Sequence, residues 1–352
     1  MAEGEETMVD VCSENTDARS SEFSVSLLQS MPLVSVAITS YSASRMRDLE
    51  ELLTSLTKQS YTNFEIVVVI EKSKELGAAI DRFVTENKIT RARVVFSQRQ
   101  LGQSQARNVA VEHCTGGIVA FIDDDAIPAT DWIECIVEKM NDDSVIALTG
   151  ATFPLWETLG AEWFPKEFYW IVSCTEFTGW KSSREVSHLW GVNMAFRREA
   201  FALARFKHGH EATERGKSGI EGDDVGFGIE LALKSLKRVL FEPSVKVYHK
   251  VKSGRLSLGY IRRKSFWLGF TRRAFRNTYR PVVGDDLDHD SIVMIAQFAI
   301  RSLLSLWRNP ITTWKRLSLA SFVLLFVGLG YITEGGKPLG IGELPSGSVG
   351  VK

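Results

Sequence analysis

The sequence has few cysteines and no excess of charge of either sign. Its four cysteines, Cys12, Cys114, Cys135 and Cys174, form neither a CxxC pair nor a zinc-binding spacing. Reduced thiols in a cytosolic compartment are therefore expected. The 42 Lys and Arg residues nearly balance the 43 Asp and Glu residues, which leaves a net charge of -1. Because nucleic-acid-binding proteins are more often basic, this balance argues against a nucleic-acid partner.

The opening residues also lack the apolar run of a secretory signal. They are acidic and rich in Ser and Thr, so residues 1–31 are predicted to form a disordered tail. The composition then indicates a globular domain over residues 32–255. It shifts again after Gly254, and residues 256–352 form a separate C-terminal region in this interpretation.

Short apolar runs alternate with amphipathic segments in the first third of the chain. Because apolar runs of this length are typical of strands buried on both faces, the alternation predicts an α/β fold with a mostly parallel sheet flanked by helices. The strands are expected at residues 33–41, 64–72, 92–98 and 117–123, and the helices at 44–60, 76–88 and 103–114.

Polar side chains follow three of these predicted strands. Ser40 and Tyr41 end the first, Glu71 ends the second, and three consecutive aspartates, Asp123 to Asp125, end the fourth. In open parallel sheets, ligands bind beyond the carboxyl ends of the strands. These side chains are therefore expected at one rim of the sheet, around a bound ligand.

The aspartate triplet needs a counter-charge. Adjacent carboxylates repel one another, and burial increases the cost. A divalent cation relieves both problems, and carboxylate oxygens suit Mg²⁺ or Mn²⁺, which also bind ligand phosphates. A calcium loop is less consistent with the sequence, because Pro128 stands where an EF-hand loop needs glycine. A solvated acidic turn at the start of the helix near Thr130 remains the other alternative.

A second acidic group, residues 221–224, precedes another predicted helix, and His249 lies near the end of a later strand. Acidic residues at a helix start are common without any catalytic role, and a single histidine is more often structural than a metal ligand. The combination of an acidic loop, a second carboxylate cluster and a histidine in one α/β chain indicates an enzyme site.

The C-terminal region favours a membrane surface. Residues 259–280 mix Arg and Lys with aromatic side chains, and residues 317–332 carry no charge. A membrane-spanning helix needs about 20 apolar residues, so this run either spans with tilt or lies in the interface. Burial in a soluble core is the third alternative. The basic, aromatic stretch favours contact with an anionic membrane.

The ordered motifs resemble family 2 glycosyltransferases of the GT-A fold. The resemblance covers residues 33–251 and is carried by "VSVAITSY", "NFEIVVVIEKS", "GQSQARNVAVEHCTGGIVAFIDDDAIPATDWIE", "GVNMAFRREAF" and "GDDVGFGIELALKSLKRVLFEPSVKVYHKV". It implies inverting, metal-dependent transfer of a sugar from a nucleoside-diphosphate sugar, with a UDP-sugar favoured. No covalent enzyme intermediate is required.

The resemblance also implies roles for individual residues. Asp125 and Asp123 correspond to the DxD pair, with Asp125 on the metal and Asp123 between the metal and the ribose. His249 corresponds to a metal ligand that some members carry. Asp224 corresponds to the general base, although Asp223 competes for that role. The remaining donor-side residues in this interpretation are Ser40, Tyr41, Glu71, Arg107 and Asp124.

The acceptor side is expected in an aromatic segment, residues 163–180, and around Trp190 and Asn193. The stretch "WFPKEFYWIVSCT" is similar to archaeal enzymes that extend dolichyl-phosphate-linked glycans in N-glycosylation. This similarity implies a lipid-phosphate-linked acceptor, a UDP-hexose or UDP-glucuronate donor, and a catalytic domain on the cytoplasmic face of the membrane. Residues 32–255 would then be the catalytic domain and residues 256–352 the membrane-associating region.

Other functions remain open at the level of sequence. A polyprenyl-phosphate monosaccharide synthase or an exopolysaccharide glycosyltransferase would have the same fold. A sugar-nucleotide nucleotidyltransferase would share the sheet and the metal carboxylates, but it normally has a glycine-rich loop after the first strand, and residues 39–47, "TSYSASRMR", contain no glycine. A non-catalytic binding protein at the membrane would not need two acidic clusters.

Overall fold

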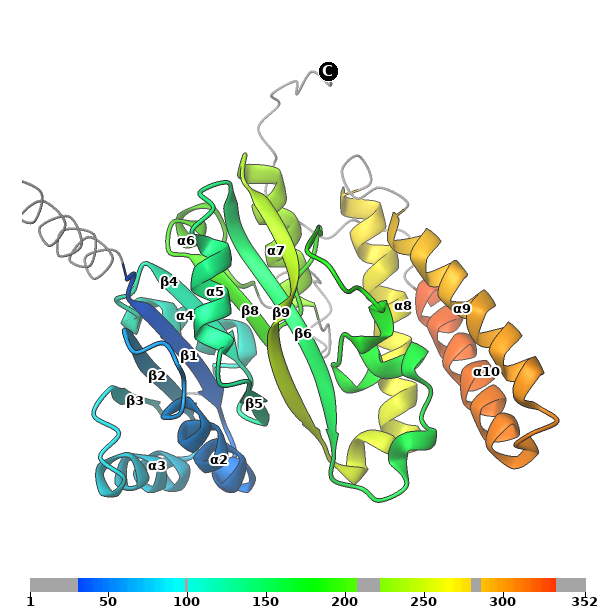
Figure 1. Ribbon diagram of the computed structural model, residues 1–352, viewed down its shortest axis with the longest axis horizontal. Coiled ribbons are helices and arrows are strands. Elements are labelled where there is room, and N and C mark those ends of the chain that lie inside the picture. Colours follow the sequence, from blue (N-terminus) through cyan, green and yellow to red (C-terminus); the bar gives the residue numbers. More distant parts are fainter. Residues whose placement is uncertain (1–30, 99–100, 208–221, 280–285, 334–352) are drawn as a thin grey trace, which may run out of the picture.

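The computed structural model describes residues 31–98, 101–207, 222–279 and 286–333. The predicted tail falls on residues 1–31, of which all but the last lie outside these ranges. The first half of the described chain alternates strand and helix as the sequence predicts (Figure 1). The strands are β1 (Val34–Ser40), β2 (Phe64–Glu71), β3 (Ala92–Ser97) and β4 (Ile118–Ile122); the helices are η1 (Ala43–Arg45), α2 (Met46–Leu56), α3 (Lys74–Glu86) and α4 (Gln103–His113).

One sheet contains these strands and five later ones in the order β3-β2-β1-β4-β8-β6-β9-β5, and β7 pairs with β9. β1 to β4 are parallel, as are β6 and β9, whereas β8 is antiparallel to both of its neighbours. The later elements are β5 (Ala126–Pro128), α5 (Trp132–Met140), β6 (Val145–Trp156), η2 (Ala161–Trp163), η3 (Lys166–Val172), η4 (Glu176–Thr178), β7 (Arg184–Glu185), β8 (Asn193–Arg197), α6 (Ala200–Leu203), α7 (Asp223–Lys234) and β9 (Arg238–Val251).

Two apolar layers enclose the sheet, which explains why its central strands are apolar on both faces. In β1, Val36 and Ile38 pack with the leucines of α2, whereas Ala37 packs on the opposite side with Ala106 of α4. All of these side chains are fully or nearly fully buried. The predicted α/β class with a mostly parallel sheet is therefore confirmed.

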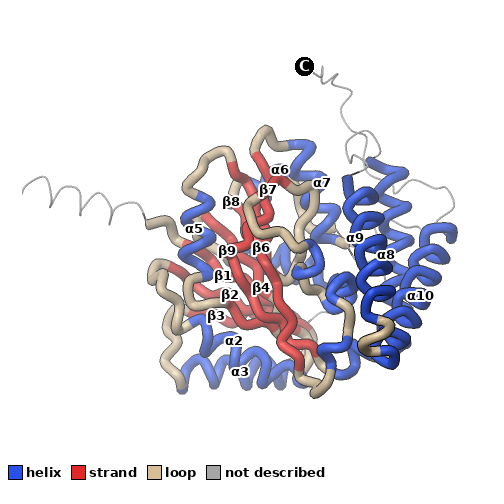
Figure 2. Tube along the Cα trace, turned by 45° about the vertical axis from the view of Figure 1, so that its right-hand side comes forward, coloured by secondary structure: helices blue, strands red, loops and turns tan. Residues whose placement is uncertain are grey.

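Three long helices follow the sheet and stand beside it (Figure 1; Figure 2). They are α8 (Leu258–Tyr279), α9 (Asp286–Ser305) and α10 (Pro310–Thr333), which η5 (Ser253–Leu256) connects to β9. A third apolar cluster joins them to the aromatic segment predicted from sequence, through Phe168, Ile171 and Val172 of η3. Side chains from both sides of the domain boundary predicted at residues 255/256 thus share one core.

Candidate active site

The aspartate triplet forms the turn between β4 and β5. β5 is short, but it pairs antiparallel with β9 so that Ala126 lies opposite His249. The backbone nitrogen of Lys250 donates to the carbonyl oxygen of Asp125 at 2.9 Å. This pairing brings His249 to the end of β4, although the two segments are far apart in the sequence.

Asp123, Asp125 and His249 offer ligand atoms that all lie within 4.8 Å of one another. His249 Nε2 lies 3.1 Å from Asp125 Oδ1. The other ring nitrogen, Nδ1, lies 2.9 Å from the carbonyl oxygen of Val172. Because a carbonyl only accepts, Nδ1 carries a hydrogen, and Nε2 is the ring nitrogen that faces Asp125.

These residues fit a divalent cation. Nε2 of His249 is buried and has no hydrogen-bond partner among the described residues. An acceptor nitrogen and a carboxylate oxygen at 3.1 Å need a cation between them, either a proton or a metal ion. Adjacent ligands of an octahedral ion at about 2.1 Å lie about 3 Å apart, close to the separation found here. The Nδ1–carbonyl hydrogen bond is the support that metal-binding histidines usually have.

Three arginines surround the triplet, and two of them were not predicted. Arg255 of η5 donates to Asp125 Oδ2 at 2.8 Å, and Arg45 of η1 donates to the same oxygen at 2.5 Å. Burial raises the pKa of Asp125, but His249 and the two guanidinium groups outweigh it and hold that pKa well below its usual range. Arg45 stands in the glycine-free loop after β1, where a basic residue was visible, whereas nothing in the sequence pointed to Arg255.

Asp124 is bound by Ser40 and Arg45 and does not belong to the group of possible metal ligands, Asp123, Asp125 and His249. Its Oδ2 accepts from Ser40 Oγ at 2.5 Å, and Arg45 lies 3.7 Å from its Oδ1. Burial and the neighbouring negative charge of Asp125 raise the pKa of Asp124 to about 7 against the opposing charge of Arg45. Ser40 and Asp124 therefore join the ends of β1 and β4.

Arg107 of α4 connects the two acidic clusters. Its Nη2 lies 3.7 Å from Asp123 Oδ1, and its Nη1 donates to both carboxylate oxygens of Asp223, at 3.2 and 3.1 Å. The Nη2 group also donates to the carbonyl of Gly191 at 3.3 Å. The guanidinium is almost fully buried between these groups, where it compensates their charge. Glu221 of the predicted cluster lies outside the described residues.

Asp224 is the carboxylate whose properties suit a base. It accepts from the backbone nitrogens of Gly191, at 2.6 Å, and Val225, at 2.9 Å. Burial and the charge of Asp223 raise its pKa to about 6, against the opposing effect of Arg107. Asp223 is instead bonded to Arg107 and to Ser104 Oγ at 3.0 Å.

Gly191 was not predicted as a site residue, yet its backbone bonds both Arg107 and Asp224. A Cβ at this position would lie 2.5 Å from Arg107 Nη2 and 3.0 Å from Asp224 Oδ2. Any larger residue at this position would therefore displace the Arg107 side chain. The sequence signal was its place at the start of the "GVNMAF" motif.

The other two predicted donor-side residues differ in their surroundings. Glu71 is buried at the end of β2, where its Oε2 accepts from the backbone nitrogens of Leu101 and, at 2.8 Å, Gly102. It thus holds the residues that lead into α4. Tyr41 is 58% exposed and lies beside the rim.

The two predicted acceptor residues also differ. Trp190 belongs to an aromatic cluster, with ring centroids 4.5 Å from His188, 6.0 Å from Trp180 and 6.1 Å from Phe241. Asn193 is fully buried. Its side chain accepts from Trp132 and donates to the carbonyls of Ala151 and Val245, so all of its amide groups are engaged inside the protein.

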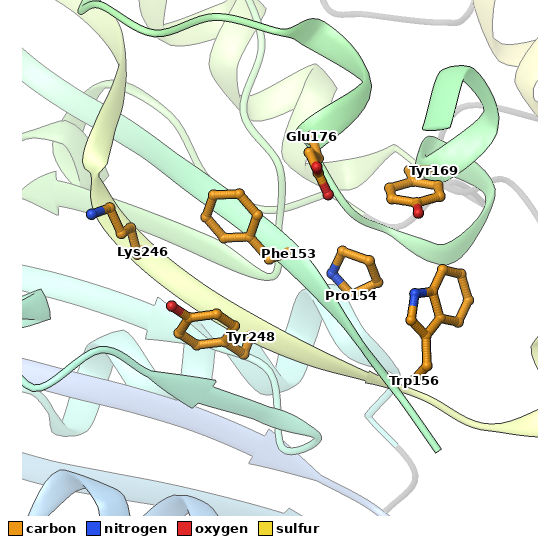
Figure 3. A pocket seen from close by; sticks show the side chains of 7 residues that line it. All are labelled: Phe153, Pro154, Trp156, Tyr169, Glu176, Lys246 and Tyr248. Atoms are coloured by element: carbon orange, nitrogen blue, oxygen red, sulfur yellow. The ribbon is translucent and has the colours of Figure 1, made fainter. Parts of the chain in front are cut away.

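An open pocket of about 380 Å³ lies on β6 and β9 next to the strand position of His249 (Figure 3). Phe153 and Tyr248 form one side of it, with ring centroids 5.9 Å apart. The remaining lining residues are Pro154, Trp156, Tyr169, Glu176 and Lys246. Aromatic rings with charged groups beside them are a surface on which a sugar ring can stack and form hydrogen bonds.

A mostly parallel sheet, an acidic group with a histidine at the end of β4 and a second carboxylate at a helix start are the features expected of a GT-A glycosyltransferase. Residues 35–203 match the family model "Glycosyl transferase family 2". The chain therefore carries a family 2 glycosyltransferase domain, as the sequence motifs indicated.

Known relatives agree with this assignment. The glucosyl-dolichyl phosphate glucuronosyltransferase of Haloferax volcanii is 28% identical over 305 residues, which cover 85% of this chain and 95% of that protein. Glycosyltransferase GlyG of Streptococcus pneumoniae is 25% identical over 177 residues, which cover 50% of this chain and 56% of that protein. The mannosyltransferase PcManGT from Pyrobaculum calidifontis, solved with GDP-Man and Mn²⁺, has a TM-score of 0.56 at 20% identity, over 87% of this chain and 88% of that one. This last likeness concerns the fold.

Proposed function

We propose that this glycosyltransferase transfers a sugar from a nucleoside-diphosphate sugar to a lipid-phosphate-linked glycan, with inversion at the anomeric carbon. The relation of Asp125 to His249 carries the proposal, because it provides a preformed site for Mn²⁺ or Mg²⁺ at the end of β4. The similarity to an enzyme of dolichyl phosphate glycosylation over most of both chains supports the class of acceptor. A UDP-hexose or UDP-glucuronate is the proposed donor.

Asp125, Asp123 and His249 would hold the cation, which when bound offsets the charge of the departing diphosphate. Arg255 and Arg45 share Asp125 Oδ2 and add positive charge at the same place.

The donor-side residues with exposed surface are Asp123, whose side chain is 29% exposed, and Tyr41, which is 58% exposed. We assign the direct donor contacts to these two, because only an exposed group can meet a ligand without a rearrangement of the rim. The buried donor-side residues act by positioning the rim; they are Ser40, Glu71, Arg107 and Asp124.

Asp224 is proposed as the general base. Its carboxylate takes the proton of the acceptor hydroxyl as that oxygen attacks the anomeric carbon from the face opposite the diphosphate. The hydrogen bonds from Gly191 and Val225 fix its orientation, and a pKa of about 6 leaves it ionised at neutral pH while it still accepts a proton. Asp223 holds Arg107 and is the weaker candidate.

The acceptor is proposed to approach through the aromatic side of the site. Trp190 directly precedes Gly191, whose backbone nitrogen donates to Asp224, so this aromatic cluster adjoins the proposed base. The C-terminal helices would keep the catalytic domain at the cytoplasmic face of the membrane, where a lipid-linked acceptor is within reach. The setting would be protein N-glycosylation or surface glycan assembly.

The test is an assay with membranes, Mn²⁺ or Mg²⁺, a panel of labelled UDP- and GDP-sugars, and dolichyl-phosphate acceptors with and without a first sugar. We expect a glycolipid product only with a glycosylated acceptor, and NMR of the product should show inversion. Transfer to bare dolichyl phosphate would instead indicate a monosaccharide synthase. Release of pyrophosphate from a sugar phosphate and a nucleoside triphosphate would indicate a nucleotidyltransferase.

A further inference from the structure

The turn between α9 and α10 carries large apolar side chains on the outside of the protein. Leu306 and Arg308 close this turn through backbone hydrogen bonds, and α9 and α10 lie side by side (Figure 1; Figure 2). Trp307 is 94% exposed. An apolar surface of this kind marks an interaction site. Six exposed residues form what we call the apex: Ile300, Leu303, Leu304, Trp307, Ile311 and Trp314.

The charges that the hairpin itself carries around the apex are all positive. Residues 295–333 contain Arg301, Arg308, Lys315 and Arg316 and no Asp or Glu. Arg301 also lies 3.3 Å from Glu167 of η3, at the inner side of the hairpin. Tryptophan at the boundary of an apolar surface, with Arg and Lys around it, is the arrangement that membrane interfaces favour. The partner that fits both properties is an anionic lipid bilayer.

The helix α10 is long and apolar enough to cross a bilayer, but its packing on α8 argues against a crossing. A Cβ at Gly269 of α8 would lie 1.9 Å from the carbonyl oxygen of Val327, and a Cβ at Gly330 of α10 would lie 1.9 Å from that of Phe266. The two backbones thus touch at two places. Because α8 and α10 are held this closely, α10 would have to take α8 into the membrane with it.

The composition of α8 makes such an insertion costly. Arg273 and Arg276 donate to the hydroxyl of Tyr331 near the end of α10. Charged side chains are strongly disfavoured in the hydrocarbon core. The same helix also packs on the catalytic part, where a Cβ at Gly226 would lie 3.7 Å from Phe275. In all, α8 carries six basic residues, Arg262, Arg263, Lys264, Arg272, Arg273 and Arg276.

We propose that α10 does not cross the membrane, and that the apex of the α9–α10 hairpin enters one leaflet of an anionic bilayer as a monotopic anchor. The exposed residues of α10 beyond the apex, Leu324, Leu325, Leu329 and Ile332, would lie along the same interface. The proposal rests on the membrane association in the proposed function, and it specifies how that association occurs.

Membrane binding by the apex is tested by sedimentation of the full-length protein with two kinds of vesicle. One is neutral phosphatidylcholine, and the other is phosphatidylcholine mixed with anionic phosphatidylglycerol. We expect binding to be at least about tenfold tighter to the anionic vesicles. The double variant Leu304→Ser, Trp307→Ser should lose this binding. Leu236→Ser, which removes a fully exposed leucine after α7, is the matched control and should bind as the unaltered protein does. Equal binding by the double variant would overturn the proposal.

The orientation is tested with a chain in which Thr333→Cys is added and Cys12 and Cys135 are replaced by Ser. A membrane-impermeant maleimide outside sealed vesicles should label residue 333 after the protein has bound from outside. Protection of that residue until detergent is added would mean that α10 crosses the bilayer, contrary to the proposal.

Two further outcomes separate this proposal from its alternatives. A dimer that the double variant loses in analytical ultracentrifugation, without vesicle binding by either protein, would mean that a second copy covers the apex and would overturn the proposal. Transfer to a short-chain, water-soluble acceptor reports on the catalytic function alone. Vesicle binding without such transfer would refute the proposed function and leave the anchor intact.

Discussion

His249 Nε2 lies 3.1 Å from Asp125 Oδ1, while the opposite ring nitrogen is fixed by the carbonyl of Val172 at 2.9 Å. The imidazole therefore has one orientation, in which Nε2 faces a carboxylate. This relation favours a metal-binding group over a solvated turn at the aspartate triplet, and it gives a direct experimental test.

We expect His249→Ala to weaken activation by Mn²⁺ by at least about tenfold, because the cation loses one protein ligand while Asp123 and Asp125 remain. The measurement is transfer activity as a function of Mn²⁺ concentration, together with thermal stabilisation by UDP plus Mn²⁺. His113→Ala is the control, because this histidine bonds a carbonyl of its own helix. An unchanged Mn²⁺ dependence would remove His249 from the proposed ligands.

Asp224→Asn should reduce turnover by about 10²–10⁴-fold, the range typical of a lost general base, with donor binding preserved. Asp223→Asn should have a smaller effect on turnover and a larger one on stability, because Asp223 pairs with buried Arg107. Pre-steady-state transfer and calorimetric UDP binding distinguish these effects. The reverse pattern would assign the base to Asp223.

The rate of transfer should rise with pH through about 6, because the Asp224 carboxyl must be ionised to accept a proton. Ionisation of the same carboxyl also lowers the stability of the folded protein. Its folded pKa lies above the unfolded value of 3.8, so the folded state binds more protons between about pH 4 and 6, and stability falls as pH rises through that window. In Asp224→Asn, both the ascending limb of the pH–rate profile and this contribution to urea stability should disappear.

Arg107→Ala should destabilise the protein by about 3–5 kcal/mol, because it leaves the carboxylates of Asp223 and Asp123 without their buried partner. Arg47→Ala is the matched control. Its guanidinium is 89% exposed and pairs with Glu51, so a change within about 0.5 kcal/mol is expected. Urea unfolding measures both. Equal stability of the two variants would show that Arg107 does not support the site.

Acceptor kinetics distinguish the aromatic cluster around Trp190 from the pocket on β6 and β9 as the acceptor site. Trp190→Ala should raise the acceptor KM without changing the donor KM, because Trp190 lies next to Gly191, whose nitrogen holds Asp224. Tyr248→Ala removes the exposed ring of the pocket on β6 and β9. An effect of Tyr248→Ala alone would place the acceptor in that pocket instead.

The sequence was sufficient for the strands and helices of the first half. Apolar runs such as that of β2 and the leucine spacing of α2 are local patterns, and burial on both faces of the sheet follows from them. The polar rim was equally predictable, because parallel strands direct their carboxyl ends to one edge. The antiparallel insertion of β8 between β4 and β6 was not, since a five-residue apolar strand has no direction in its sequence.

The sequence by itself determined which carboxylates stand at strand and helix ends, and the family motifs in order. Only the tertiary structure decided how those charges are compensated. Arg255 reaches Asp125 across 130 residues of chain, and Arg107 reaches Asp223 across 116. Such pairs depend on the register of β5 on β9 and on the placement of α4 beside the start of α7. Because many registers are compatible with the same local pattern, no local signal could have specified them.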